Sequence, residues 1–209
     1  MGASIFKKVI NIPNGARFFS YKERLSIDKS VKFISVGSLR YQKNFTIAIK
    51  ALSHLKNIDW HYEIIGTGPL KTQLEKLINS LGLQDKVTLS GWCTNLEGKY
   101  HNADIQLLPS RFEGFGLVAV EGMSTGLPVI ASDVQGLNEV VSSSIESCFL
   151  VKDINNIDAW VDQIKLCINA LEKNLPHISK ESYQHSQKFS LSKMTKSYID
   201  LYIQVLKNE

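Results

Sequence analysis

The sequence predicts a doubly wound α/β fold with a parallel sheet, and three observations support this prediction. Several short apolar runs are continuous rather than alternating in polarity, as in strands that are covered on both faces. Amphipathic segments with helical spacing separate these runs. Strand and helix alternate so often that helices on both faces of the sheet, joined by right-handed crossovers, are the arrangement we expect.

Five expected strands occur in chain order: VKFISV, YEIIG, VTLSG, DIQLLP and PVIAS. Two apolar stripes predict the first helices. Their members are Phe45, Ile49, Leu52 and Leu55, then Leu70, Leu74, Leu77, Ile78 and Leu81. Gly82 follows the second stripe and is placed to end that helix.

The last third of the chain has a weaker pattern. The segment VSSSIESCFLV indicates a loop and a short strand, a stripe from Trp160 to Leu171 indicates a helix, and PHISKESYQHS indicates a polar linker or a helix. The segment from Ser192 to Leu206 predicts a helix with two apolar faces. Either another body packs on this helix, or the helix lies buried in a groove of its own domain.

Composition places the chain among ordinary globular proteins. With 209 residues, of which 44% are hydrophobic and 21% charged, one domain is the expectation. The net charge of +4 favours phosphorylated ligands, but no dense block of Lys and Arg indicates nucleic-acid binding. Three cysteines with apolar neighbours predict free buried thiols. The sequence shows no membrane span or signal peptide, which favours the cytoplasm.

The segments that follow the strands are the candidate binding segments, because ligands of open parallel sheets bind outside the carboxyl ends of the strands. These segments are GSLRYQKN, GTGP, GWC, SRFEGFG and SDVQG. Each contains glycine, which allows the backbone to approach a ligand closely, although tight turns in any α/β protein also use glycine.

Two acidic residues, one in the fourth of these segments and one after it, bound the uncharged run GFGLVAV. We expect a turn at Gly114–Gly116 and a helix from near Phe115, so that Glu113 precedes the turn and Glu121 lies on the helix. At a rise of about 1.5 Å per residue their separation is on the order of 10 Å. Glycosidases hold their two carboxyl groups about 5 to 9.5 Å apart, so the separation of Glu113 and Glu121 is too large for glycoside hydrolysis.

The spacing suits a ligand with hydroxyl groups at both ends and a diphosphate between them, such as a nucleotide sugar. The free amides of the helix start would hold the diphosphate, and Lys43, with Arg40 nearby, would compensate its charge. No Asp-x-Asp pair offers a divalent metal its usual carboxylates. On spacing alone, the favoured alternative is structural: Glu113 caps the helix and Glu121 is a solvated helix residue.

Longer stretches carry a family resemblance. They are VINIPNGARFF, FISVGSLRYQKNFTIAIKAL, IIGTGPLKTQLEKLINSLGLQDKVTLSGW, ADIQLLPSRFEGFGLVAVEGMSTGLPVIASDVQGLNEVV and FSLSKMTKSYIDLYIQV. Together they resemble the carboxyl-terminal domain of the family-4 (group 1) retaining glycosyltransferases of the GT-B fold. The resemblance implies a single nucleotide-sugar domain over residues 1–209, with residues 1–29 as interdomain linker and 190–207 as closing helix.

The resemblance also implies roles for individual residues. Glu113 matches the glutamate that contacts the donor sugar, and Glu121 the glutamate that binds ribose. Lys43 matches the lysine that contacts the phosphates of the donor. The stretch whose backbone faces the sugar and diphosphate corresponds to Phe115, Gly116 and Leu117. The nucleotide pocket corresponds to Gly66, Trp92 and Cys93.

The mechanism that the resemblance implies needs no metal, no cofactor and no enzyme nucleophile. The donor would be a UDP- or GDP-type sugar, and its leaving diphosphate would deprotonate the acceptor hydroxyl. Glu113 would then orient the sugar and act electrostatically.

Two features depart from the family pattern. Many members have arginine directly after the first glycine, whereas Ser38 follows Gly37 here; Arg40 is the nearest substitute. A complete GT-B enzyme also has a second domain, which holds the acceptor. This chain begins near the interdomain linker, so we expect it to be inactive alone and to need an acceptor-binding domain of the same protein or of another subunit.

Two other interpretations compete with a donor domain. One is a binding or assembly module that keeps the fold without catalysis. The other, a nicotinamide-dependent enzyme, is weak because the first segment lacks three spaced glycines. Basic residues near the start of the chain are candidates for a peripheral membrane contact, but a solvated linker is the favoured account; they are Lys7, Lys8, Arg17, Lys22 and Arg24.

Overall fold

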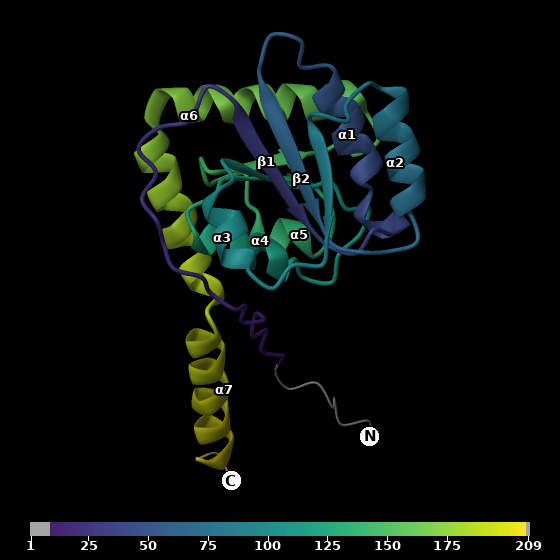
Figure 1. The fold of residues 1–209 in the computed structure, drawn as a ribbon. Helices are drawn as coiled ribbons and strands as arrows, with labels where there is room; N and C mark the ends of the chain where they lie inside the picture. The colour runs from purple at the N-terminus through teal and green to yellow at the C-terminus, as the bar shows by residue number, and fades with distance from the viewer. Residues whose placement is uncertain (1–8, 208–209) are drawn as a thin grey trace.

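The computed structural model describes residues 9–207, which form a six-stranded parallel sheet with helices on both faces (Figure 1). The strand order is β3-β2-β1-β4-β5-β6, the order of a Rossmann-like doubly wound sheet. This confirms the predicted fold class. The strands are β1 (Val31–Val36), β2 (Trp60–Ile65), β3 (Val87–Gly91), β4 (Ile105–Leu108), β5 (Val129–Ser132) and β6 (Cys148–Val151).

Seven α-helices and two 3-10 turns connect and follow the strands within the described residues. They are η1 (Tyr41–Lys43), α1 (Phe45–Ser53), α2 (Lys71–Ser80), α3 (Leu96–His101), α4 (Leu117–Ser124), α5 (Leu137–Val140), α6 (Ile157–Ser186), η2 (Gln187–Phe189) and α7 (Leu191–Leu206).

Side chains from the two faces of the sheet enter different apolar clusters. Phe33 of β1 packs with α1, α2 and the first part of α6. Its neighbour Ile34 points to the opposite face and packs with Tyr100 of α3, while Val129 and Ala131 of β5 pack with α4 and α5. Burying each large apolar side chain contributes about 2 kcal/mol. Both faces of the sheet are therefore sealed by helices, as the continuous apolar runs predict.

The predicted elements match the structure closely in the first two thirds of the chain. VKFISV and VTLSG coincide with β1 and β3, and the other three expected strands differ from β2, β4 and β5 by one or two residues at their ends. Gly82 adopts a left-handed φ of +67° directly after α2, and the amide of Leu83 bonds back to the carbonyl of Ile78 at 3.0 Å. This confirms the predicted glycine stop.

The segment PHISKESYQHS is helical and forms the second half of α6. Asn174 leaves the helical conformation (φ −159°, ψ 65°), and its side chain accepts a hydrogen bond from the amide of His177 at 3.3 Å. The helix restarts there, so Pro176 lies in a new first turn, where its missing N–H is not needed.

The sheet has a topological switch point between β1 and β4. These strands are neighbours, but the chain forms β2 and β3 on one side of them and β5 and β6 on the other. In such sheets a crevice opens outside the carboxyl ends of the two central strands. The residues that follow β1 and β4, at 37–44 and 109–116, are therefore the ones placed to hold a ligand.

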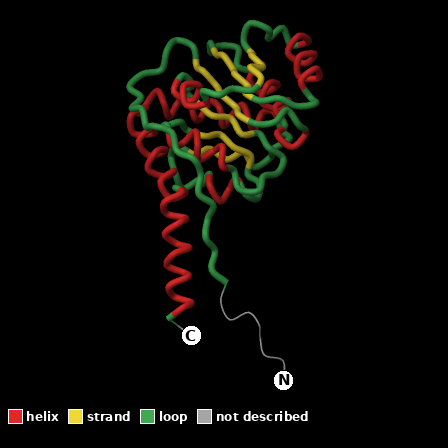
Figure 2. Tube along the Cα trace, turned by 60° about the horizontal axis from the view of Figure 1, so that its bottom comes forward, coloured by secondary structure: helices red, strands yellow, loops and turns green. Residues whose placement is uncertain are grey.

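Helix α7 projects from the body beside the first described residues (Figures 1 and 2). The amide of Ala16 donates to the carbonyl of Phe189 at 2.9 Å and joins the two segments at their base. Across the described part of α7 no side chain is buried, so of the two alternatives the groove in its own domain is wrong. Residues 9–29 form no helix or regular strand, and residues 1–8 of the expected linker, with Lys7 and Lys8, lie outside the described residues.

Two further predictions can be compared with the structure. The three cysteines are unpaired; Cys148 and Cys167 are buried, whereas Cys93 is half-buried. Burial raises the pKa of the Cys148 thiol to about 11. Within residues 9–207, no helix combines the length and apolar character that crossing a membrane requires.

Candidate functional site

Lys43 reaches the crevice from the loop that follows β1. The loop ends with the 3-10 turn η1 and Asn44. Asn44 has a left-handed φ of +50° and is the N-cap of α1. The side chain of Lys43 lies across Gly37: a Cβ at Gly37 would stand only 3.1 Å from the Lys43 Cε. Glycine at this position therefore leaves the lysine room to extend toward the neighbouring loop.

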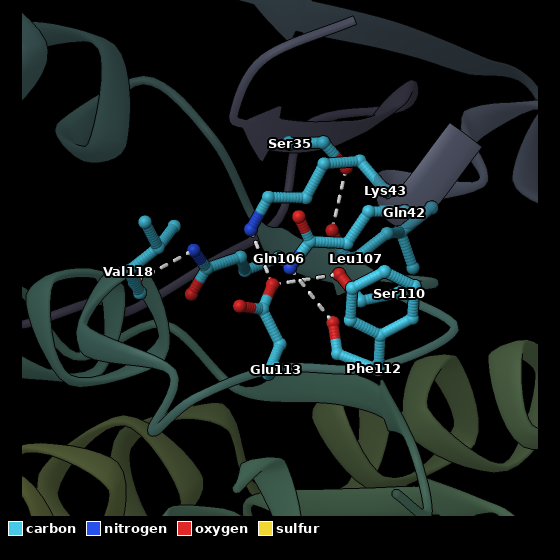
Figure 3. A network of polar contacts seen from close by, with 9 residues as sticks. All are labelled: Ser35, Gln42, Lys43, Gln106, Leu107, Ser110, Phe112, Glu113 and Val118. Atoms are coloured by element: carbon cyan, nitrogen blue, oxygen red, sulfur yellow. Dashed lines mark hydrogen bonds and ion pairs between the residues drawn. The ribbon is translucent and has the colours of Figure 1, made fainter. Parts of the chain in front are cut away.

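Glu113 reaches the same crevice from the loop that follows β4. Its Oε1 forms an ion pair with Lys43 Nζ and accepts a hydrogen bond from Ser110 Oγ at 2.8 Å (Figure 3). The pair is largely shielded from water, because only 16% of the lysine side chain and 13% of the glutamate side chain are exposed. Attraction between the charges is stronger here than on an open surface.

Direct hydrogen bonds hold the two loops together beside the ion pair. The amide of Arg111 donates to the carbonyl of Gln42 at 2.7 Å, and the Gln42 side-chain amide donates to the carbonyl of Phe112 at 3.0 Å. Arg111 Nη2 also bonds Asn44 Oδ1 at 3.1 Å. The relative position of Lys43 and Glu113 is therefore fixed by the backbones that carry them.

Helix α4 begins at Leu117, two residues after the predicted start at Phe115. Gly116 is the N-cap and adopts a φ of +89°, which a side chain would strain. Phe115 instead packs edge-on against Phe189, with ring centroids 5.7 Å apart, and anchors the loop. No side chain of residues 9–207 caps α4, so the structural alternative in which Glu113 is the cap is wrong.

A cavity of about 420 Å³ lies at this helix start, a size usual for small-ligand sites. The amide end of α4 carries partial positive charge, which favours an anion. Lys43 and Glu113 contribute a cation and an acceptor for hydroxyl groups. The lining residues are Asn14, Lys43, Leu108, Glu113, Gly114, Phe115, Gly116, Leu117, Val118 and Leu137.

Glu121 lies farther along α4 and is half-buried. The hydroxyl of the fully buried Tyr100 stands 3.5 Å from Glu121 Oε2. Burial raises the pKa of the Glu121 carboxyl group, and the charge of Arg17 opposes this rise. A carboxylate held partly out of water in this way differs from the fully solvated helix residue of the structural alternative.

The other residues predicted for the nucleotide pocket lie at the ends of β2 and β3. A Cβ on Gly66 would stand 1.9 Å from the carbonyl oxygen of Gly37, so only glycine fits there. The Gly66 amide donates to the carbonyl of Gly91 at 2.7 Å, which packs the ends of β1, β2 and β3 together. Beyond Gly91, Trp92 is 76% exposed, and Cys93 packs beside the cluster that contains Tyr100.

Neither Ser38 nor Arg40 is among the residues that line the cavity at the ion pair. Arg40 is exposed and lines a separate cavity of about 200 Å³ with Tyr41, Gln73 and Arg111. Arg24, expected on a solvated linker, instead turns inward and donates to the carbonyls of Tyr100 and Ala103.

Sequence reasoning missed four residues of the site. Ser110 and Gln42 fix the ion pair, Tyr100 faces Glu121, and Asn14 lines the cavity from the segment before β1. Ser110 carries a local signal, since it lies three residues before Glu113 in the segment after β4. The other three act across long distances in the chain and carry none.

Comparison with known proteins identifies relatives over most of the chain. Residues 17–185 match the family described as Glycosyl transferases group 1. The lipopolysaccharide core biosynthesis mannosyltransferase LpsB of Rhizobium meliloti is 32% identical over 149 residues, covering 68% of this chain and 42% of that protein. The alpha-D-kanosaminyltransferase of Streptomyces kanamyceticus is 32% identical over 130 residues, covering 60% of this chain and 34% of that protein.

Solved structures show the same fold. A glycosyltransferase from Rickettsia africae superposes with a TM-score of 0.78 and 25% identity, covering 88% of this chain and 50% of that one. HepE of Anabaena, solved with UDP and glucose, superposes with a TM-score of 0.75 and 22% identity, covering 84% of this chain and 49% of that one. This chain thus spans half or less of the length of these relatives, and it belongs to the group 1 glycosyl transferase family.

Proposed function

We propose that this chain is the donor-binding half of a glycosyltransferase that binds a UDP- or GDP-type sugar and transfers the sugar, with retention, to an acceptor hydroxyl group. The observation that carries the proposal is the shielded pair of Lys43 and Glu113 at the topological switch point, beside the free amide end of α4. The UDP and glucose in the HepE structure support this choice of ligand.

The ligand would lie along α4. Its diphosphate meets the amides of the helix start and Lys43 Nζ, which supply positive charge without a metal ion. A sugar hydroxyl donates to Glu113, and the ribose hydroxyls donate to Glu121. Both carboxylates act as hydrogen-bond acceptors for the two hydroxyl-bearing ends of one ligand, Glu113 from the loop before α4 and Glu121 from the helix.

In the proposed transfer the bond between the anomeric carbon and the diphosphate oxygen breaks, and the acceptor oxygen bonds to the same face of that carbon. The acceptor proton passes to the leaving diphosphate. Lys43 and the α4 amides stabilise the charge that develops on this leaving group. Glu113 holds the sugar in the geometry that the step requires.

The acceptor would bind to a second domain, of the same full-length protein or of another subunit. The matches cover 42%, 34% and 50% of the relatives' own length, and α7 presents an uncovered apolar surface on which such a domain can pack. LpsB, named for lipopolysaccharide core biosynthesis, supports a role in building a polysaccharide or glycoconjugate. We expect no transfer by the isolated chain.

Titration calorimetry with the UDP, GDP and ADP sugars tests donor binding. We expect heat from one of the first two sets at millimolar concentration or below; no heat and no thermal stabilisation with any of them contradicts the proposal. Binding without transfer after a candidate acceptor domain is added indicates the alternative, a binding module without catalysis.

Two variants test the assigned roles. Glu121→Ala should weaken the nucleoside diphosphate and its sugar derivative alike, because both ligands carry ribose. Glu113→Ala should weaken only the sugar derivative, on the order of tenfold or more, the usual effect of losing a hydrogen bond to a charged group. Equal losses for the two ligands in the Glu113 variant contradict its role at the sugar.

A further inference from the structure

The two contacts of the Glu113 carboxylate converge on one oxygen. Lys43 Nζ and Ser110 Oγ both donate to Oε1, and Figure 3 draws both contacts to that atom. Oε2 accepts no hydrogen bond from any of residues 9–207. The carboxylate is therefore anchored by one oxygen, and the other can accept a hydrogen bond in the cavity that Glu113 lines.

Ser110 is a fixed support for this anchor. It is 1% exposed and follows β4, a strand paired on both sides by β1 and β5. The amide of the next residue, Arg111, is bonded to the loop after β1. The serine hydroxyl is therefore already ordered, and ligand binding costs it little conformational entropy.

Lys43 has a second partner in the proposed complex. Its ammonium group would face the diphosphate, whose negative charge competes with Glu113 for the same donors. Ser110 is uncharged and buried, and its hydroxyl donates to Glu113 Oε1. When Lys43 turns toward phosphate, the serine remains as the described contact that holds Oε1.

We infer that Ser110 is a positioning residue for donor-sugar recognition: it keeps Glu113 Oε1 in place while Lys43 serves the diphosphate, so that Oε2 accepts a hydrogen bond from a sugar hydroxyl. This inference rests on the proposed function. It assigns Ser110 an effect on the sugar end of the ligand and none on the nucleotide end.

The test compares ligands with and without the sugar. Calorimetry of Ser110→Ala with UDP, UDP-glucose and UDP-galactose, or with GDP and GDP-mannose, should show unchanged affinity for the nucleoside diphosphate. Affinity for the sugar derivative that wild type binds should fall on the order of tenfold.

Ser182→Ala is the matched control. Ser182 is also fully buried, and its hydroxyl bonds the carbonyl of Leu127, but it lies on α6 and does not line the cavity. We expect this variant to bind both ligands as wild type does, even where the loss of its hydrogen bond lowers thermal stability.

A double variant separates positioning from a general structural effect. If Ser110 acts through Glu113, adding Ser110→Ala to Glu113→Ala causes no further loss of affinity for the sugar derivative, whereas independent effects multiply. Multiplied effects, equal losses for both ligands, or wild-type binding by Ser110→Ala overturn the inference and leave the proposed function standing. If wild type binds none of these ligands, the proposed function fails and this inference fails with it.

Discussion

Glu121 sits half-buried on α4 with the hydroxyl of Tyr100 3.5 Å away. Burial raises the pKa of its carboxyl group above the ordinary value of 4.5. The folded protein therefore holds this proton to a higher pH than the unfolded chain does. As pH rises through the window that begins near 4.5, this group lowers the free energy of unfolding. At neutral pH the charged residue destabilises the fold that presents it to a ligand.

Replacing Glu121 with Gln should therefore stabilise the protein at pH 7 by about 1 kcal/mol, within the usual range for one stabilising substitution. The gain should largely disappear at pH 4, where the wild-type carboxyl group is mostly protonated. Urea denaturation at both pH values measures it. Glu75→Gln, on α2, is the control and should not stabilise the protein at pH 7, because this exposed carboxylate pairs with Lys71. An equal gain at both pH values contradicts the burial account.

At the scale of elements, the loop that carries Glu113 is supported by a glycine from another loop. Gly136 has a φ of +88°, and a Cβ there would stand 2.3 Å from the carbonyl oxygen of Glu113. Gly82, after α2, has the similar φ of +67°, but a Cβ there would meet none of the described residues within 4 Å. The two glycines share a positive φ and differ in the space around them.

This pair of glycines gives a matched prediction. Gly82→Ala should lower the free energy of unfolding by about 1 kcal/mol, the cost of a left-handed conformation alone. Gly136→Ala should cost about 2 to 3 kcal/mol and weaken sugar-nucleotide binding, because backbone must also move. Urea denaturation and calorimetry measure both effects. Similar behaviour of the two variants, in stability and in binding, would show that the 113–116 loop tolerates displacement.

The elements themselves could be predicted from the sequence because their causes are local. Apolar runs predicted β1 and β3 to the residue, and Gly82 marked the end of α2. The start of α4 was misplaced because Phe115 is held by Phe189, far along the chain. Lys43 and Glu113 were predicted from their segments. Gln42 and Tyr100 were missed, since the contact of Gln42 joins two loops about 70 positions apart and that of Tyr100 joins α3 to α4, about 21 positions apart.

At the scale of the whole molecule, α7 stands outside the compact body that the sheet organises (Figure 1). Its apolar side chains are exposed, including Tyr202 at 63% and Leu206 at 71%. Folding of this chain therefore removes little of their apolar surface from water. The two-faced pattern in the sequence predicted such a surface, although sequence could not decide between a partner and a groove.

Replacing Ile199 and Ile203 by Lys should therefore change the free energy of unfolding by less than about 0.5 kcal/mol, as at other exposed positions. Ile164→Ala, in the fully buried part of α6, is the contrast and should cost about 2 to 5 kcal/mol. Urea denaturation compares the variants. A large loss in the α7 variant would show that the helix packs on its own body.

The junction at the base of α7 has a consequence for the order of folding. Gly15 donates to the sulfur of Met194, and the two residues are 179 positions apart. Closing so long a loop adds little to the equilibrium cost, since each doubling of length costs only about 0.6 kcal/mol. On a ribosome, however, Met194 emerges long after Gly15. The contact between Gly15 and Met194 therefore forms only after the intervening sheet has been synthesised, and the sheet can assemble before it.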